Sequence, residues 1–297
     1  MSSILVFPGQ GSQFVGMGKE LYDNYPAARE VFDAVDDALG QKLSEIIFNG
    51  PMDELTLTAN VQPAIFAVSL AMLKASGAAL PEFVAGHSLG EYSALCAAGA
   101  LGVADTAKLL RLRGNAMQEA VPVGLGLTAV IISNEQLAIS NLCARAESET
   151  GEIVDVANDN SPGQVVISGA KAAVERAMEL AKEQGAKRAM PLQLSAPVHC
   201  RLQEPTASIL RAAIAGTEFR APAATFISNR TAAPMTDVSE IKESLVYQIT
   251  HGVRWRETIL SLPGLGITET VEVGPGNVLT GLTTRIVPEL TARKLEI

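Results

Sequence analysis

The sequence predicts an α/β protein in which a small domain is inserted into a larger one. Short apolar runs alternate with longer helical patterns along most of the chain, which is typical of an α/β fold. The segments within 124–194 instead follow the order strand, helix, strand, strand, helix, strand, which is the ferredoxin-like arrangement. We therefore expect a larger unit formed by residues 1–123 and 195–297, interrupted by a ferredoxin-like subdomain over 124–194.

The first third of the chain supplies the α/β alternation. "SILVF" (3–7) predicts a strand, followed by a Gly-rich turn and helical patterns through Leu39. Residues 60–77 predict a buried helix that Gly77 closes. The pattern then predicts a strand over 82–86 and helices over 89–98 and 104–120.

The middle of the chain carries the predicted insertion. Its strands are expected over 128–133, 152–157, 164–169 and 187–194, and its helices over 134–150 and 170–185. After "LSAP" the chain returns to α/β alternation, with further strands expected over 225–228 and 267–274.

Composition excludes several classes of protein. The net charge of -9 gives no general attraction to nucleic acid or to an anionic membrane. The most apolar run, over 61–73, is too short to span a bilayer, and the N-terminal run is too short for a signal peptide. The three cysteines, Cys96, Cys143 and Cys200, show neither disulfide nor zinc spacing. We expect a cytoplasmic protein with buried thiols and no metal site.

The stretch "VAGHSLGEY" contains the pattern Gly86-x-Ser88-x-Gly90 between a predicted strand and a predicted helix. In a nucleophile elbow, small flanking residues permit the sharp turn that exposes the serine oxygen. The start of the following helix offers free N–H groups to an oxyanion. We expect Ser88 to be a nucleophile, although the five-residue pattern also arises by chance.

A serine nucleophile needs a base, and the chain has three histidines. His87 neighbours Ser88 in a tight turn, where adjacent side chains point apart, so a structural role is expected. His251 lies in "QITHGVRW", near an expected helix end, where a solvated or capping role is usual. His199 follows the strand that closes the insertion, and Pro197 restrains it. We expect His199 to be the base.

A third catalytic residue is not evident. Asp155 and Asp159 lie between the serine and the histidine in chain order, but neither has a strand-end context near His199. A Ser–His dyad oriented by a backbone carbonyl fits better. Cys200 adjoins His199, and adjacent side chains pair poorly, which disfavours a cysteine enzyme.

Six motifs give the chain a family resemblance. They are "FPGQGSQ", "GHSLGEYSAL", "LRGNAMQEAVP", "NDNSPGQVVISG", "SAPVHC" and "VEVGPGNVLTGL". In this order they resemble the malonyl-CoA:acyl-carrier-protein transacylases of bacterial fatty-acid synthesis, from about Phe7 to Leu282. The resemblance implies an α/β-hydrolase-like core with an inserted ferredoxin-like domain, which agrees with the pattern above.

The resemblance also implies a ping-pong reaction. Ser88 attacks malonyl-CoA, and the phosphopantetheine thiol of acyl carrier protein then takes the malonyl group. His199 serves as base and then as acid, and the main-chain carbonyl of Gln248 orients it. The implied partners are malonyl-CoA and acyl carrier protein, without nucleic acid, membrane, metal or bound cofactor. We expect a monomer.

The resemblance assigns the oxyanion hole to the backbone N–H groups of Leu89 and Gln10. Gly9 and Gly11 would let the chain bring the Gln10 amide close to the reacting carbonyl. The same stretch could be a dinucleotide-binding loop, but that motif requires glycine at the position of Phe14.

Arg113 matches the malonate-binding arginine of the family. A guanidinium fork can hold a carboxylate bidentately, whereas a solvated position on an amphipathic helix is the alternative from sequence alone. Arg111 points to another helix face. Asn158 matches a polar residue near the substrate cleft, or is a turn residue before "SPG".

The chain departs from the family pattern at three positions. Thr128 stands where many relatives have methionine, and it either alters the cleft floor or is an ordinary strand residue. Val198 stands where many have phenylalanine or serine, which leaves selectivity against methylmalonyl groups open, and Asn277 replaces a frequent lysine without an expected chemical consequence. Lys182, Lys187 and Arg188 are candidates for docking an acidic carrier protein, or are solvated. Two other functions remain as alternatives: a serine hydrolase such as a thioesterase, and a non-catalytic carrier-binding subunit.

Overall fold

A computed structural model describes residues 2–122, 124–133 and 138–297. Its larger sheet is formed by β1 (Ser2–Phe7), β2 (Phe83–Gly86), β7 (Thr225–Ile227), β8 (Pro234–Met235), β9 (Ile267–Glu272) and β10 (Thr291–Lys294). Their spatial order is β10-β9-β1-β2-β7-β8. All neighbours pair in parallel except β7 and β8, which are antiparallel.

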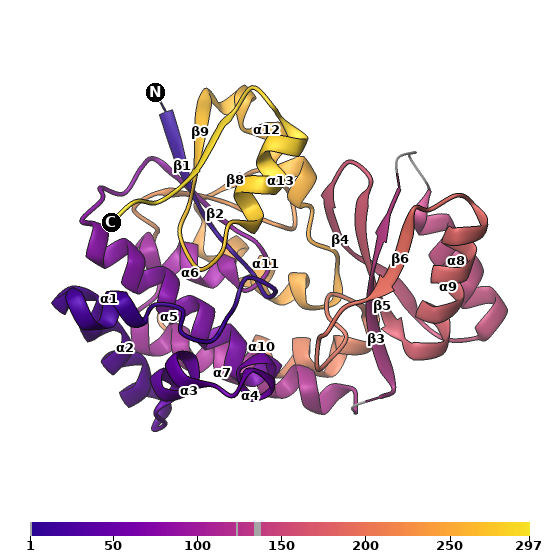
Figure 1. Ribbon diagram of the computed structural model, residues 1–297, viewed down its shortest axis with the longest axis horizontal. Helices are drawn as coiled ribbons and strands as arrows, with labels where there is room; N and C mark the ends of the chain where they lie inside the picture. Colours follow the sequence, from indigo (N-terminus) through magenta and orange to yellow (C-terminus); the bar gives the residue numbers. More distant parts are fainter. Residues whose placement is uncertain (1, 123, 134–137) are drawn as a thin grey trace.

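Helices surround the larger sheet (Figure 1). They are α1 (Lys19–Asn24), α2 (Pro26–Leu39), α3 (Leu43–Asn49), α4 (Met52–Thr56), α5 (Thr58–Ser76), α6 (Gly90–Ala97), α7 (Val103–Ala120), α10 (Glu204–Ala215), α11 (Val238–Thr250), α12 (Trp255–Ser261) and α13 (Val278–Ile286). Short 3₁₀ turns occur at η1 (Arg201–Gln203) and η2 (Pro263–Leu265).

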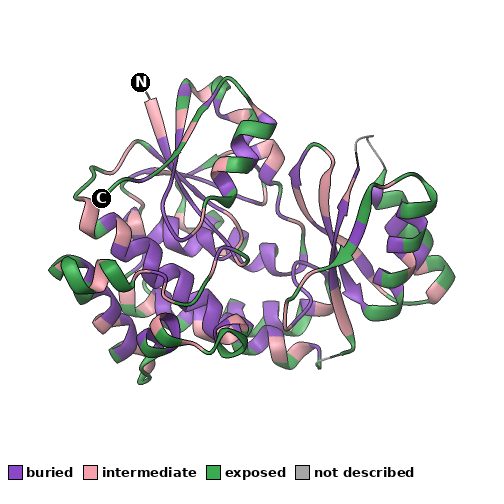
Figure 2. Ribbon diagram, in the orientation of Figure 1, coloured by how far each residue is buried: buried purple, intermediate pink, exposed green. Residues whose placement is uncertain are grey.

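The central strands β1 and β2 of the larger sheet are mostly buried, as Figure 2 shows, whereas the edge strand β10 is mostly exposed. Successive side chains of a strand point to opposite faces. Leu5 and Phe7 of β1 accordingly join the core formed with α2, α5 and α7, whereas Ile4 and Val6 join the core formed with α12 and α13. Strands covered on both faces have continuous apolar runs, which explains why the buried part of β1, "ILVF", is apolar throughout.

The smaller sheet lies beside the larger one (Figure 1) and is antiparallel. It consists of β3 (Gly126–Ile132), β4 (Val154–Ser161), β5 (Gln164–Ala170) and β6 (Arg188–Pro191), in the spatial order β4-β5-β3-β6. α8 (Ile139–Thr150) and α9 (Lys171–Glu183) cover one face. The elements follow the predicted chain order of strand, helix, strand, strand, helix, strand.

Most predicted elements are present, with some different limits. β4 runs on to Ser161, beyond the expected 152–157, because its second half pairs with β5. β6 ends at Pro191, short of the expected 194, because its pairing with β3 ends there. The expected start of the helix at 134 and the expected boundary at 123 fall outside the described residues.

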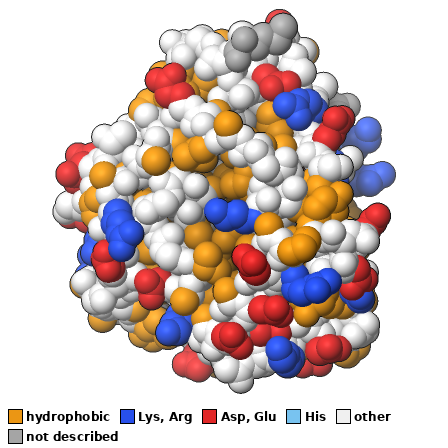
Figure 3. Space-filling model, turned by 90° about the vertical axis from the view of Figure 1, so that its left-hand side faces the viewer, with side chains coloured by type: hydrophobic (Ala, Val, Ile, Leu, Met, Phe, Trp, Pro, Cys, Tyr) orange, Lys and Arg blue, Asp and Glu red, His pale blue; other side chains and the backbone are white. Residues whose placement is uncertain are grey.

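The surface and the cysteines also bear on the predictions. Cys96, Cys143 and Cys200 are buried free thiols, as expected. On the face shown in Figure 3, acidic and basic side chains are interspersed rather than gathered by sign. Within the described ranges, no helix is long and apolar enough to cross a membrane.

Candidate active site

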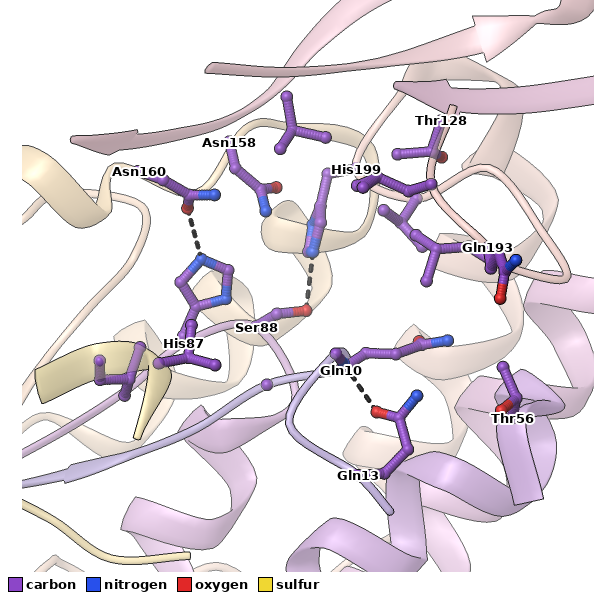
Figure 4. A pocket seen from close by; sticks show the side chains of 18 of the residues that line it. Gln10, Gln13, Thr56, His87, Ser88, Thr128, Asn158, Asn160, Gln193 and His199 are labelled. Atoms are coloured by element: carbon purple, nitrogen blue, oxygen red, sulfur yellow. Dashed lines mark hydrogen bonds between the residues drawn. The ribbon is translucent and has the colours of Figure 1, made fainter. Parts of the chain in front are cut away.

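A cavity of about 330 Å³ brings most of the predicted site residues together (Figure 4). Those that line it are Gln10, Ser88, Arg113, Asn158 and His199. The other two, Leu89 and Gln248, are buried next to Ser88 and His199. Thr128 and Val198, two positions where the chain departs from the family pattern, also line the cavity. Seven residues from distant parts of the sequence therefore meet at one place.

The parallel pairing of β1 and β2 explains why Gln10 and Ser88 are neighbours. Phe7 and Gly86, the last residues of the two strands, lie in register. The carboxyl ends of adjacent parallel strands open at the same sheet edge, where ligands of α/β proteins bind. The His87 N–H donates to the Phe7 carbonyl at 2.9 Å, which fastens the two loops together.

The turn at Ser88 has the strain expected of a nucleophile elbow. Its φ of 56° lies in the left-handed region that non-glycine residues seldom adopt. The two flanking positions must be glycine, because a side chain there would collide with the backbone. A Cβ on Gly86 would lie 1.9 Å from the carbonyl carbon of Gly90, and a Cβ on Gly90 would lie 2.2 Å from the Phe7 carbonyl oxygen. The Ser88 N–H donates to Asn229 Oδ1 at 2.9 Å, which stabilises the turn.

His199 contacts the serine directly. Its Nε2 lies 2.7 Å from Ser88 Oγ, and its Nδ1 lies 2.7 Å from the main-chain oxygen of Gln248. A carbonyl can only accept, so Nδ1 carries the hydrogen and Nε2 is free to accept from the serine hydroxyl. Gln248 lies in the last turn of α11, where carbonyls have no partner within the helix. The helix end thus orients the imidazole.

The smaller sheet holds the loop that carries His199. His199 also has a left-handed φ, of 54°. The N–H of the preceding Val198 donates to Ser168 Oγ on β5 at 2.9 Å, and that hydroxyl lies 2.9 Å from Thr128 Oγ1 on β3. Two hydroxyl groups of the smaller sheet therefore hold Val198, the residue that precedes His199.

Both buried histidines near the serine are held neutral. Burial and the charge of Arg113 lower the pKa of His199 to about 3, against the opposing effect of its bond to the Gln248 carbonyl. Burial also lowers the pKa of His87, whose Nε2 lies 2.8 Å from Asn160 Oδ1. The structural role expected for His87 fits this bond, which links the elbow to β4. His251 is the exposed C-cap of α11.

Arg113 is buried, with 1% of its surface exposed. Its Nη1 donates to Gln62 Oε1 at 2.7 Å, and its Nη2 donates to Gln248 Oε1 at 2.8 Å and to Ser88 Oγ at 3.2 Å. Burial lowers its pKa. Its Nε has no hydrogen-bond partner among the described residues. The alternative that Arg113 is solvated on an amphipathic helix is therefore wrong. Arg111 donates instead to Asn60 and Gln41.

Asn158 lies within β4, so the alternative of a turn residue is wrong. Its Oδ1 is buried without a hydrogen-bond partner among the described groups, and the same is true of Gln10 Nε2. Both atoms belong to side chains that line the cavity. An acceptor and a donor are thus free for a ligand. Asp155 and Asp159 bond to Arg201 and Arg256 rather than to His199.

Sequence reasoning missed four buried residues around the site: Gln62, Glu91, Asn160 and Asn229. Glu91 is fully buried, and burial raises the pKa of its carboxyl to about 8, against its bonds to Asn229 and Gln248 and the charge of Arg113. A signal for it existed: it is the one charged residue in the otherwise uncharged helix "GEYSALCA". Asn229 and Gln62 have no such signal.

This fold and site are those of an acyltransferase, since a family model described as "Acyl transferase domain" matches residues 4–289. A malonyl CoA-acyl carrier protein transacylase of Bacillus subtilis (strain 168) is 48% identical over 96% of this chain and 91% of its own length. The chain belongs to the malonyl CoA-acyl carrier protein transacylase family.

Solved structures agree with that assignment. The acyl-carrier-protein S-malonyltransferase of Bartonella henselae superposes with a TM-score of 0.96 at 48% identity, covering 100% of this chain and 96% of the other. A malonyl-transacylase solved in complex with a type II polyketide synthase acyl-carrier protein gives 0.95 at 42% identity, covering 100% and 97%. The mixed α/β fold is therefore shared over the whole chain.

Proposed function

We propose that this protein transfers the malonyl group of malonyl-CoA to the phosphopantetheine thiol of acyl carrier protein, in fatty-acid biosynthesis, through a malonyl-serine ester. The observation that carries the proposal is that Ser88 Oγ lies 2.7 Å from His199 Nε2 and 3.2 Å from Arg113 Nη2. The proposed base and the proposed carboxylate-binding cation therefore both contact the oxygen of the proposed nucleophile.

In the first half-reaction, His199 Nε2 takes the hydroxyl proton as Ser88 Oγ attacks the thioester carbonyl. The tetrahedral intermediate collapses, the carbon–sulfur bond breaks, and the departing coenzyme A thiolate takes the proton from His199. The carbonyl of Gln248 stabilises the imidazolium that exists between these steps, as does the negative end of the α11 dipole.

The second half-reaction reverses these roles. With coenzyme A gone, the carrier thiol gives its proton to His199, and its sulfur attacks the ester carbonyl. The Ser88–carbon bond breaks, and Ser88 Oγ recovers the proton. A dyad suffices for both halves because the same imidazole acts as base and then as acid.

The N–H groups of Leu89 and Gln10 form the proposed oxyanion hole. Leu89 is the N-cap residue of α6, where N–H groups have no partner within the helix. The loop of Gln10 packs tightly on the elbow, since a Cβ on Gly9 would lie 2.8 Å from the His87 carbonyl oxygen. Removing one oxyanion donor costs other acyl-transfer enzymes roughly 10²–10³ in rate.

Arg113 confers selectivity for malonyl in this proposal. Its buried guanidinium would pair with the free carboxylate of the malonyl group, whereas an acetyl group would leave the cation without an anion. The free oxygen of Asn158 would accept an N–H of the pantetheine arm. Gln248 orients His199 through its main chain and Arg113 through its side chain.

We propose the corresponding architecture as an α/β-hydrolase-like core, residues 1–123 and 195–297, with a ferredoxin-like insertion over 124–194. The strand order of the smaller sheet supports the second part. The chemistry needs no metal or bound cofactor, because coenzyme A enters with the substrate. We propose a cytoplasmic monomer.

The carrier-protein surface is proposed to include Lys187 and Arg188, which are exposed where the chain enters β6. Lys182 is exposed nearby in the sequence. Reversal of both charges should raise the KM for an acidic carrier protein and leave Ser88 acylation by malonyl-CoA unchanged. An unchanged KM would remove these residues from the surface.

Intact-protein mass spectrometry after brief mixing with malonyl-, methylmalonyl- or acetyl-CoA tests the proposed reaction. We expect one malonyl adduct on the native protein and none on Ser88→Ala. Arg113→Ala should lose the malonyl adduct, whereas Arg111→Ala, on the same helix but bonded elsewhere, should keep it. The methylmalonyl sample measures the selectivity that Val198 leaves open.

The same samples separate the proposed function from its alternatives. Release of free malonate without a persistent adduct would identify a hydrolase. Absence of both adduct and turnover would identify a binding subunit.

A further inference from the structure

The carboxyl group of Glu91 lies beneath the elbow and takes no part in the reaction proposed above. Glu91 is the second residue of α6 and is fully buried. Its Oε1 accepts from the Asn229 N–H at 2.6 Å, and its Oε2 accepts from Gln248 Nε2 at 2.5 Å. A buried carboxyl is costly unless hydrogen bonds satisfy it, and here each oxygen has an N–H donor.

The first of these donors belongs to a residue that fixes the amino side of the elbow. Asn229 Oδ1 accepts from the Ser88 N–H at 2.9 Å, and Asn229 Nδ2 donates to the Gly86 carbonyl at 2.7 Å. Asn229 therefore holds the backbone on both sides of His87. Its own position is set by the bond from its main-chain N–H to Glu91.

The second donor belongs to Gln248, which fixes the carboxyl side. Gln248 Nε2 also donates to the Ser88 carbonyl at 2.9 Å, and Gln248 Oε1 accepts from Arg113. An amide can present its NH₂ group in only one of two orientations. The Glu91 Oε2 and the Ser88 carbonyl both accept from this NH₂ group, which leaves the Gln248 side-chain oxygen facing Arg113.

We propose that Glu91 is a positioning residue that acts through Asn229 and Gln248 to hold the strained backbone of Ser88 and the side chain of Arg113. Both the N–H and the C=O of Ser88 are bonded to side chains that Glu91 holds. The left-handed conformation of Ser88 persists because its surroundings over-determine it. This inference rests on the proposed role of Ser88 as nucleophile.

A fluorophosphonate probe carries no carboxylate, so it measures the reactivity of Ser88 without the proposed pairing of Arg113 with a malonyl group. Ser88 Oγ attacks phosphorus, the phosphorus–fluorine bond breaks, fluoride leaves, and His199 takes the serine proton. In Glu91→Gln, one acceptor becomes an NH₂ group that faces an N–H donor. We expect labelling of Ser88 to slow at least tenfold, and the ratio of malonyl to acetyl acylation to fall as Arg113 loses its orientation.

Asp36→Asn is the matched control, because it changes another buried carboxyl that accepts two bonds, both from Ser44, and lies in α2. Its labelling rate per folded molecule should equal that of the native protein. Equal rates in Glu91→Gln and the native protein would overturn the inference. Failure of the native protein to acquire a malonyl adduct would instead refute the proposed function.

A second measurement decides the matter if Glu91→Gln does not fold. In the native protein, the Gln248 side-chain NH₂ protons should resonate downfield in NMR spectra and exchange slowly with solvent. Both protons are hydrogen-bonded, one to the Ser88 carbonyl oxygen and the other to the buried Glu91 carboxyl. Rapid exchange at ordinary amide shifts would show that Glu91 does not hold Gln248, and would overturn the inference.

Discussion

At the scale of single residues, the site depends on two left-handed backbones. Ser88 and His199 have φ values of 56° and 54°. Such conformations cost a non-glycine residue of order 1–3 kcal/mol. In both cases backbone N–H groups at or beside the residue donate to buried side chains, Asn229 and Ser168. Residue type at these positions is therefore limited by the backbone as well as by the chemistry.

Substitution of the nucleophile tests that limit. A β-branched residue resists positive φ more than an unbranched one. Ser88→Thr should therefore form the malonyl adduct at least 10²-fold more slowly than the native protein, whereas Ser88→Cys, which keeps an unbranched nucleophile, should still form one. Rapid mixing with mass-spectrometric detection gives both rates, and equal rates for Thr and Ser would contradict the argument.

The base gives a prediction about stability and pH. His199 is neutral in the folded protein, because its pKa is lowered from 6.5 to about 3, but it takes a proton in the unfolded chain below pH 6.5. The free energy of unfolding should therefore fall as pH decreases from 6.5 toward 3. Between pH 7 and 5 this amounts to roughly 2 kcal/mol.

His199→Ala should lack this contribution. Urea unfolding of both proteins at pH 7 and pH 5 measures it, and the native protein should lose about 2 kcal/mol more than the variant over that interval. His87, whose pKa is also lowered, contributes equally to both proteins. Parallel losses would show that His199 is not held neutral by the fold.

At the scale of elements, the close packing of α6 on β1 positions the turn that carries Ser88. A Cβ on Gly90 would lie 2.2 Å from the backbone oxygen of Phe7, which no side-chain rotation can relieve. Gly90→Ala should destabilise the protein by about 2–4 kcal/mol. Gly264→Ala, where a Cβ meets nothing within 4 Å, is the control and should be near neutral. Thermal unfolding compares the two.

Local patterns predicted short strands such as β2 and β7 as well as long helices such as α5 and α7, but they gave no range for α10 and α11. β1, β2, α5 and α7 carry continuous or amphipathic apolar patterns, which depend only on local sequence. β8 has two residues and exists because it pairs with β7, a contact that local sequence does not encode. The second half of β4 was missed for the same reason, since "NDNS" resembles a turn until β5 pairs with it.

The residues of the site also differ in how far local sequence predicts them. Ser88 and His199 could be inferred from local patterns, and Arg113, Gln10 and Gln248 only from the family resemblance. Asn229 and Gln62 could not be predicted, because each acts through a hydrogen bond to a residue more than fifty positions away.

At the scale of the whole molecule, the two sheets share the active site. The larger sheet carries Ser88, and the smaller sheet holds the His199 loop through Ser168. Ser168→Ala leaves the buried Val198 N–H without that acceptor, which should cost about 1–3 kcal/mol of stability. The serine–histidine alignment should loosen, and malonyl adduct formation should slow about tenfold at 25 °C, equivalent to ~1.4 kcal/mol.

Ser69→Ala serves as the control for Ser168→Ala. The Ser69 hydroxyl is buried without a partner among the described groups, so its removal should change neither unfolding nor adduct formation. Unaltered kinetics in Ser168→Ala would mean that the smaller sheet does not set the position of the base.

The charge of Arg113 is one of the reasons that the pKa of His199 is low. A malonyl carboxylate seated on the guanidinium would neutralise that charge, and the proton affinity of the neighbouring imidazole would rise at the moment when a base is needed. An acetyl thioester brings no anion and would meet a weaker base. The substrate would thus supply part of its own activation, and the enzyme would recognise malonyl by a change in reactivity as well as by fit.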